Sequence, residues 1–518
     1  MRRILLPTIL LNLLNWSNVA TALPFGSKPG KKTDDNDDDA AAQVRVRGTA
    51  AKVTKQLQSA DDTSLLATVQ TFVQDTSSVV VSSDNLQSAL RAAANTTEMR
   101  DFLQSARRSL HRHPELMYDL PFTSEVIQTT LKELNISFTT GWARNTHPEA
   151  FPGPGGFGIV AHIGSMSADQ PCVILRADMD ALPILEATSH IDAFKSRQTG
   201  KMHACGHDGH VTMLLGAAAV LKQIEATLPG TVRLVFQPAE EGGAGMKRMI
   251  EEGVVEMEPR AVWGFGMHVW PTLPTGVVAS TAGALMAATE TFEIVIHGKG
   301  GHAAMPHLTI DPIVAAASFI LNVQTLVSRT VSPLDSGVVS VTQVETPGDA
   351  FNVIPASTKL RGTIRSLGTE SLLDLRSKVE HMLQSVSTMY NCNSTIAYMP
   401  DYYPPTVNDA TLFDKFAAPV GALVSREGVV RATVPTMGGE DFAFLAQTIP
   451  STFFFVGQGS GHQKEGDGIP PTNYGLHHPS FALDENVLPV GVELHTNLAI
   501  RALHALSRKD IASPAEEL

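Results

Sequence analysis

Residue types that bind metals or act as nucleophiles are concentrated in a nine-residue stretch, MHACGHDGH, which runs from Met202 to His210. The stretch holds three histidines and one of the three cysteines in a chain of 518 residues. Cys205 and His207 are separated by one residue, and thiolate and imidazole are common ligands of zinc and other transition metals. A nucleophilic cysteine with a histidine base is the alternative chemistry. Neighbouring loops supply carboxylates, which favours the metal site.

Two adjacent carboxylates, Glu240 and Glu241, follow the apolar run VRLVF in the stretch QPAEEGGAG. Consecutive side chains of an extended segment point to opposite sides. One carboxylate could therefore bind a metal while the other faces the water bound to that metal. His268, in the stretch AVWGFGMHV, adds a further ligand type at the end of another apolar run.

These residues lie where strands are predicted to end. CVILRADMDALPI is a predicted strand that ends in acidic residues, including Asp178, and HVTMLLGAAAVLKQIEA is a predicted helix. Strands that alternate with helices are typical of an α/β domain with a largely parallel or mixed sheet flanked by helices. Ligands of such sheets bind beyond the carboxyl ends of the strands. We therefore expect these acids and histidines to meet at one edge of the sheet.

A second unit with a different order of elements is predicted over residues 290–398. Its apolar runs spell β-α-β-β-α-β, the order of the ferredoxin-like split unit. Glycine-rich polar loops resume after it, so we expect an inserted ferredoxin-like α+β domain that serves as a lid or a dimerisation domain. The catalytic, metal-binding domain is then formed by residues 98–289 and 399–510, and the two domains enclose one cleft.

The N-terminus is predicted to be a signal peptide over residues 1–22. Two arginines precede an apolar run, Ile4 to Leu14, and a small-x-small site ends at Ala22. A short membrane anchor is the alternative, but the run is shorter than the roughly 20 residues of a membrane span. No later stretch is expected to be long and apolar enough to span. This indicates the secretory pathway, with secretion or the endoplasmic reticulum lumen as destination, and an organelle with bipartite targeting remains open.

Residues 23–97 are expected to be a polar linker followed by a helical extension of uncertain role. The stretch from Gly26 to Ala40 is charged and lacks large apolar residues, which is typical of a solvated tether. The compact domain is expected to begin near Glu98, at a helix that Pro114 stops. Three sequons are compatible with a glycoprotein; they begin at Asn95, Asn135 and Asn393.

Composition limits the partners of the chain. Hydrophobic residues make up 43% and charged residues 18%, as in an ordinary globular protein. The formal net charge is −13, and no basic stripe runs along the chain, so we expect no nucleic-acid partner. An odd number of cysteines, three, is too few for a disulfide framework. We expect a small-molecule substrate and no membrane association once the signal peptide is removed.

Eight stretches in chain order resemble one known family between Arg107 and Leu506. It comprises the metal-dependent amidohydrolases and metallopeptidases related to hippurate hydrolase, N-acyl-amino-acid amidohydrolases and hydrolases of auxin–amino acid conjugates. The stretches are RRSLHRHPEL, LRADMDALPI, MHACGHDGH, FQPAEEGGAGM, GKGGHAAMPH, FNVIPASTKLRGTIR, GGEDFAFL and LHHPSF.

The resemblance implies a site for two divalent metal ions. Glu240 corresponds to the general base, and Asp178 to a carboxylate that orients a ligand of the cluster. His477 is chosen over His478 because the family motif carries a histidine two residues before the proline. Zinc suits the thiolate ligand best, while manganese, cobalt and nickel also fit such mixed sites. The implied ligands are Cys205, His207, Glu241, His268 and His477.

The inserted domain carries three more residues to which the resemblance gives a role. His302 corresponds to the histidine that reaches the site, often that of the partner subunit of a homodimer, and hydrogen-bonds the oxyanion. Asn352 and Arg365 correspond to the pair that holds the free carboxylate of the substrate. The implied reaction is hydrolysis of N-acyl amino acids to a carboxylic acid and an amino acid. A dipeptidase or carboxypeptidase is the neighbouring alternative, and a non-catalytic binding protein is a more distant one.

Overall fold

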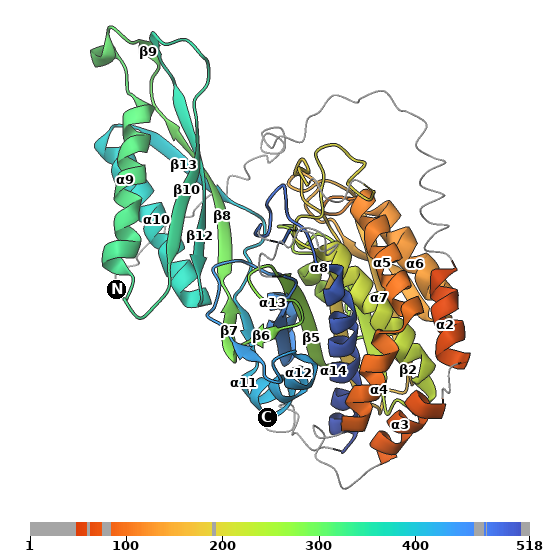
Figure 1. Cartoon of the computed structure of the whole chain (residues 1–518). Coiled ribbons are helices and arrows are strands. Elements are labelled where there is room, and N and C mark those ends of the chain that lie inside the picture. The colour runs from red at the N-terminus through yellow and green to blue at the C-terminus, as the bar shows by residue number, and fades with distance from the viewer. Residues whose placement is uncertain are drawn as a thin grey trace.

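The computed structural model has a larger domain, the predicted catalytic domain, and a smaller inserted domain (Figure 1). Two crossing segments join them, one that leads into residue 288 and one that follows residue 398. The predicted signal peptide and the charged tether lie outside the described residues. The structure describes residues 48–59, 63–74, 84–188, 193–459, 471–472 and 474–508.

The catalytic domain is built on a mixed sheet of eight strands, parallel at its centre. The predicted α/β class with a largely parallel or mixed sheet is confirmed. Three parallel pairs, β4–β3, β3–β5 and β5–β16, place the carboxyl ends of these strands at one edge. In sheet order the strands are β1 (Ser137–Arg144), β2 (Gly155–Gly164), β4 (Thr231–Gln237), β3 (Cys172–Asp178), β5 (Ala261–Trp270), β16 (Ser451–Gly457), β6 (Val278–Ser280) and β15 (Arg431–Ala432).

Helices cover both faces of this sheet. Every residue of β3 is buried, and alternate side chains enter two separate cores, as the pleat of a strand requires. Val173 and Leu175 pack in the larger core and Ile174 in the smaller one. The helices of the larger core include α5 (Thr97–Arg112), α6 (Pro121–Glu133), α7 (His207–Gln223), α12 (Ala418–Val424) and α14 (Leu488–Arg508), and those of the smaller core are α8 (Gly245–Glu251) and α13 (Phe442–Thr448).

Three helices that precede residue 98 belong to the larger core. They are α2 (Thr49–Ser59), α3 (Thr63–Gln74) and α4 (Asp84–Ala94), and their apolar side chains pack with α5, α7 and α14. The Glu493 carboxylate on α14 accepts hydrogen bonds from Gln87, Arg91 and Asn95. The compact unit therefore begins before the predicted start near Glu98. Helix α2 (TAAKVTKQLQS) and helix α4 (DNLQSALRAAA) have few large apolar residues, so their patterns resemble that of a polar extension.

The inserted domain has the predicted β-α-β-β-α-β order. Its four antiparallel strands lie in the order β10-β12-β8-β13, and both helices pack on one face of the sheet. A short pair, β9 (Gly301–His302) and β11 (Val353–Ile354), lies at the end farthest from the catalytic domain (Figure 1). The main elements are β8 (Ala288–His297), α9 (Pro312–Thr330), β10 (Val338–Glu345), β12 (Ser357–Ser366), α10 (Thr369–Met389) and β13 (Asn393–Tyr398).

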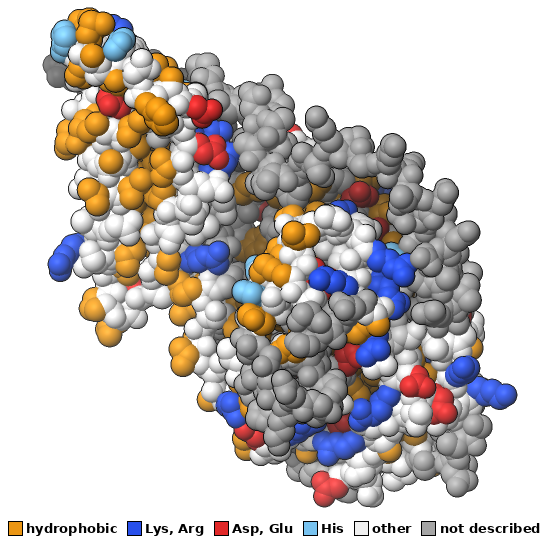
Figure 2. All heavy atoms as spheres, turned by 45° about the horizontal axis from the view of Figure 1, so that its top comes forward, with side chains coloured by type: hydrophobic (Ala, Val, Ile, Leu, Met, Phe, Trp, Pro, Cys, Tyr) orange, Lys and Arg blue, Asp and Glu red, His pale blue; other side chains and the backbone are white. Residues whose placement is uncertain are grey.

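Helix α9 corrects one expectation from the sequence. Among the described residues, it is the helix that is long and apolar enough to cross a membrane, judged by length and composition only. One face of α9, with Phe319 and Val323, is buried in the core of the inserted domain. Leu321 is 74% exposed on another face, and hydrophobic side chains gather over this domain in Figure 2. The helix is therefore apolar on more than its buried face.

Phe72 on α3 tests whether the N-terminal helices belong to the cooperative core. It is buried, and its ring centroid lies 4.7 Å from that of His504. We expect Phe72→Ala to lower the free energy of unfolding by about 3–5 kcal/mol, as for a buried aromatic side chain. Leu66→Ala, at an exposed position of the same helix, should cost less than about 1 kcal/mol. Denaturant titration of both variants measures this, and equal losses would contradict the assignment.

Candidate metal centre

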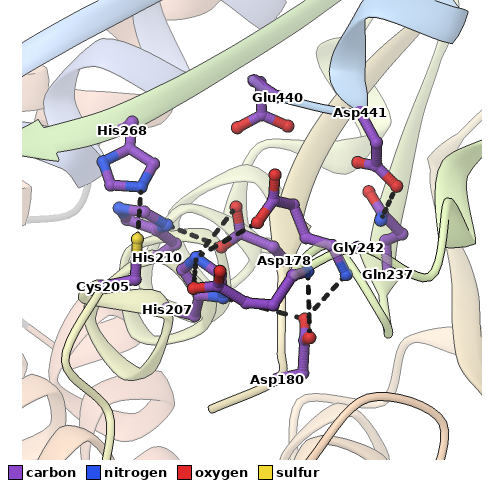
Figure 3. A network of polar contacts seen from close by, with 12 residues as sticks. Asp178, Asp180, Cys205, His207, His210, Gln237, Gly242, His268, Glu440 and Asp441 are labelled. Carbon is purple, nitrogen blue, oxygen red and sulfur yellow. Dashed lines mark hydrogen bonds and ion pairs between the residues drawn. The ribbon is translucent and has the colours of Figure 1, made fainter. Parts of the chain in front are cut away.

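The predicted ligands converge beyond the carboxyl ends of the central strands, and Figure 3 shows three of them, Cys205, His207 and His268, beside Asp178 and Asp180. Gly206 separates two of them and has a φ of 94°, a left-handed conformation that glycine adopts without strain. This turn lets Cys205 and His207 face the same point at the start of α7. The six predicted residues come from four segments: Cys205 and His207 at the start of α7, Glu240 and Glu241 after β4, His268 in β5, and His477 before α14.

Two groups of three ligands share the Cys205 thiol. Within each group, the atoms that could bind a metal lie within 4.8 Å of one another. The Cys205 Sγ atom is 3.2 Å from Nε2 of His268 and 3.3 Å from Nε2 of His477. His477 Nε2 is in turn 3.4 Å from a Glu241 carboxylate oxygen. One group is Cys205, His207 and His268, and the other is Cys205, Glu241 and His477.

The histidines of the centre are in a state that suits metal binding. Both ring nitrogens of His207 are buried and make no hydrogen bond to any described residue, which is costly unless another partner satisfies them. His268 donates its Nδ1 proton to the Val269 carbonyl oxygen at 2.7 Å. That bond leaves Nε2 free to bind a metal, as is usual for a metal-binding histidine. The residues present therefore fit a metal centre.

The electrostatic surroundings also favour bound cations. Burial lowers the pKa of His207, but the carboxylates of Asp178 and Asp180 more than offset this and raise it to about 10. Burial and the charges of Glu241 and Glu240 raise the pKa of the Cys205 thiol well above its usual value. Without a cation the thiol is therefore protonated and a poor nucleophile. A divalent cation reverses this balance, because a metal-bound thiol is deprotonated.

Arg176 holds the surrounding acids in place. Its buried guanidinium lies 2.7 Å from Asp178, 2.9 Å from Glu440 and 2.9 Å from Asp441. The last two acids belong to GGEDFAFL, at the start of α13. Burial and the charges of Glu440 and Glu241 raise the pKa of Glu240 well above its usual value. Glu240 therefore lies where a carboxylate can hold a proton that it has taken up.

Asp180 contacts the candidate centre directly, and the sequence analysis did not single it out. Asp178 accepts a hydrogen bond from Nδ1 of His210 at 2.6 Å, and its other oxygen is 3.8 Å from Nε2 of His207. An Asp180 oxygen lies 3.8 Å from Nδ1 of His207. Asp180 also accepts hydrogen bonds from the backbone N–H groups of Glu240 and Glu241. The sequence does carry a signal for this residue. Asp180 is the second acid of RADMD, and because it follows Asp178 by two residues, an extended segment places both side chains on the same side.

The three residues predicted to act from the inserted domain lie at two different places, Arg365 near the catalytic domain and the other two at the far end. Arg365 on β12 is half-buried, and its Nη1 donates to the Met437 carbonyl oxygen at 2.8 Å, across the domain boundary. Burial lowers the pKa of His477, the Glu241 carboxylate more than offsets this, and the Arg365 guanidinium is close enough to lower it again. His302 and Asn352 are exposed at the β9–β11 end (Figure 1). The structure does not bring these two to the centre of their own chain.

A cavity of about 390 Å³ lies beside Glu241, between the two domains. Two carboxylates that line the cavity, Glu293 of the inserted domain and Asp401 of the segment after β13, already form ion pairs. Glu293 contacts Lys359 at 3.3 Å and Arg361 at 2.9 Å, and Asp401 is paired with Lys247 and Arg248. The rest of the lining is mainly apolar and includes Leu116, Met117, Phe151, Leu182, Phe292 and Met399.

Known proteins are similar to this chain in sequence over most of its length. The Arabidopsis thaliana protein named IAA-amino acid hydrolase ILR1-like 2 is 40% identical over 435 residues, covering 83% of this chain and 92% of its own length. N-acetylcysteine deacetylase of Bacillus subtilis is 37% identical over 404 residues, covering 78% of this chain and 97% of its own. Both similarities extend over most of each chain.

A solved structure of the Bacillus subtilis YXEP protein, described as a dinuclear metal binding peptidase from M20 family, superposes with a TM-score of 0.60. It is 34% identical and covers 78% of this chain and 98% of its own. Residues 174–501 match the family described as Peptidase family M20/M25/M40. The resemblance inferred from the eight stretches is confirmed, and this chain belongs to peptidase family M20/M25/M40.

Proposed function

We propose that this chain hydrolyses the amide bond of N-acyl amino acids and releases a carboxylic acid and a free amino acid. The observation that carries the proposal is the pair of ligand groups that share Cys205, with the Glu240 carboxylate beside them. The names of two similar proteins, an IAA-amino acid hydrolase and an N-acetylcysteine deacetylase, support the same reaction class.

Two divalent metal ions, when bound, would lower the pKa of a water molecule and polarise the amide carbonyl. Cys205, His207, Glu241, His268 and His477 would hold them. The Glu240 carboxylate, 3.9 Å from Nε2 of His207, takes the proton from the attacking water and delivers it to the leaving amine. The thiolate favours zinc, and manganese, cobalt or nickel also suit this ligand set.

The inserted domain is proposed to hold the substrate carboxylate. No carboxylate of the described residues forms an ion pair with Arg365, whose planar fork can grip a substrate carboxylate with two parallel hydrogen bonds. His302 and Asn352 are proposed to act in the site of a partner subunit, as a homodimer through the inserted domain would allow. Their exposed positions, next to the fully exposed Phe351, support this.

The cavity beside Glu241 is proposed to hold the acyl group. Its apolar lining suits a hydrocarbon or aromatic acyl group. A dipeptidase would need a carboxylate for the substrate ammonium group, and Glu293 and Asp401 are already paired with basic side chains. This observation favours N-acyl amino acids over dipeptides.

Entry into the secretory pathway, removal of a signal peptide and glycosylation are also proposed, and sequence patterns support them.

Release of amino acids from a substrate panel tests this function. The panel contains N-acetyl, N-benzoyl and N-indolylacetyl amino acids together with matched dipeptides, assayed with and without a chelator. We expect turnover of N-acyl amino acids that the chelator abolishes and added zinc or manganese restores. Preference for dipeptides would favour the alternative, and no turnover of any member would overturn the proposal.

Glu240→Gln separates the general base from the metal ligands. The amide keeps the size of the side chain and removes the proton acceptor. We expect turnover to fall at least about 10²-fold, while bound metal per chain and the unfolding midpoint stay at parent values. A variant that hydrolyses substrate at the parent rate would show that Glu240 is not the base.

Cys205→Ala separates a ligand from a nucleophile. If the thiolate binds metal, the variant should contain less metal per chain, and excess zinc should restore part of the activity. If the thiol is a nucleophile, metal content should stay unchanged while activity is lost. Cys172→Ala is the matched control, because Cys172 is buried in β3 outside both ligand groups. Elemental analysis of the purified variants distinguishes the outcomes.

Arg365→Lys keeps the charge and removes the planar fork. We expect kcat/KM for N-acyl amino acids to fall about 10- to 100-fold, the range for a lost charged hydrogen bond. The corresponding amino-acid amides lack the carboxylate and should be poor substrates of parent and variant alike. Arg376→Lys, on α10 and paired with Glu290, is the control. Equal efficiency of the parent toward acids and amides would contradict anchoring at the carboxylate.

A further inference from the structure

Tyr403 lies in a segment that crosses between the two domains. The chain leaves the inserted domain after β13 and enters β14 (Thr406–Asn408) of the catalytic domain. Tyr403 exchanges two backbone hydrogen bonds with Thr289 on β8, both of 2.9 Å. Thr289 lies on the other crossing, where β8 begins. The backbone of Tyr403 is therefore part of the hinge between the domains.

The Tyr403 hydroxyl contacts the turn that carries the proposed base. It donates a hydrogen bond to the Glu240 carbonyl oxygen at 2.7 Å. It accepts hydrogen bonds from the backbone N–H groups of Gly242 at 3.0 Å and Ala244 at 2.9 Å. A phenol has one donor and two acceptor positions, so all of them are used, and the side chain is buried.

The turn needs such support because its backbone is strained. Ala239 and Ala244 have φ values of 59° and 55°, a left-handed conformation that alanine rarely adopts. Strained residues persist where the surrounding structure over-determines them. Asp180 binds the N–H groups of Glu240 and Glu241 at one end, and Tyr403 binds the rest of the turn. The turn is thus held by hydrogen bonds from two sides, from Asp180 just after β3 and from Tyr403 in the hinge.

A second link joins the same crossing segment to the helix after the turn. Asp401, two residues before Tyr403, pairs with Lys247 and Arg248 on α8. The Tyr403 ring also packs edge-on against Phe444 of α13, with ring centroids 5.9 Å apart. The hinge, the turn and α8 are therefore held together by the Tyr403 hydroxyl, the Asp401 ion pairs and the packing of the Tyr403 ring.

We propose that Tyr403 is a positioning residue. Its hydroxyl fixes the turn that orients the Glu240 carboxylate toward the candidate metal centre, and its backbone joins this turn to the hinge of the inserted domain. The inference rests on the proposed hydrolytic function. Removing the hydroxyl takes a partner from the buried Ala244 N–H, from the half-buried Gly242 N–H and from the Glu240 carbonyl oxygen. The last two still bond each other, whereas the Ala244 N–H loses its partner, so the turn relaxes at that point. A displacement of about 1 Å in a reacting group can lower turnover about 10²-fold.

Tyr403→Phe removes this hydroxyl alone, and Tyr402→Phe is the matched control. Tyr402 packs against the core of the inserted domain, and its hydroxyl makes no hydrogen bond to the described residues. With the best substrate of the panel, we expect Tyr403→Phe to lower kcat at least about tenfold, because the base is displaced. KM should stay within about threefold, because the variant keeps the ring that lines the cavity beside Glu241. Bound metal per chain should match the parent, and Tyr402→Phe should keep kcat within about twofold.

The assay is run below the temperature at which each variant begins to unfold, as measured by circular dichroism. The positioning role is overturned if Tyr403→Phe keeps the parent kcat, raises KM as much as it lowers kcat, loses metal or fails to fold. It is also overturned if Tyr402→Phe loses as much turnover. A parent enzyme without activity on the panel removes the proposed function and this inference together, whereas an active parent with an equally active Tyr403→Phe variant removes this inference alone.

Discussion

The centre depends on one buried cation, the guanidinium of Arg176. A carboxylate loses a large solvation energy when it is buried, and a close, hydrogen-bonded cation must offset that loss. Arg176 contacts Asp178, Glu440 and Asp441 at once, so it joins the end of β3 to the start of α13. Removing one partner of such a buried group typically costs about 3–5 kcal/mol. Arg176 therefore allows the acid-rich edge of the sheet to exist before any metal binds.

The two aspartates of RADMD hold the residues around the candidate metal centre through separate hydrogen bonds. Asp178 binds His210, and His210 accepts a hydrogen bond from the Val269 backbone next to His268. Asp180 binds the backbone of Glu240 and Glu241. The two aspartates of RADMD thus reach two different strand ends, β5 and β4. The predicted ligands come from four segments of the chain, so the contacts that fix the backbone of these segments also fix the relative positions of the ligands.

Most of the fold and of the ligand cluster could be predicted, because local rules agree with the tertiary structure there. Apolar runs that end in acids mark parallel strands, and Cys205-x-His207 marks the start of a helix beyond one of them. Predictions failed where the deciding contact is distant. The burial of Phe72 depends on α14, which lies more than 400 residues later. The hydrogen bonds between Tyr403 and the Glu240 turn join residues about 160 positions apart, and no local sequence pattern predicts such contacts.

The three residues of the inserted domain that are proposed to bind the substrate lie at two ends of its sheet. Arg365 lies where β12 runs toward the crossing segments, and it contacts Met437 of the catalytic domain. His302 and Asn352 lie at the opposite end, next to exposed Met305 and Phe351. A rigid sheet cannot bring both of its ends to one centre of the same chain. If all three residues bind one substrate, the two ends must come from different chains, and the exposed apolar residues beside His302 are the surface that such an assembly would cover.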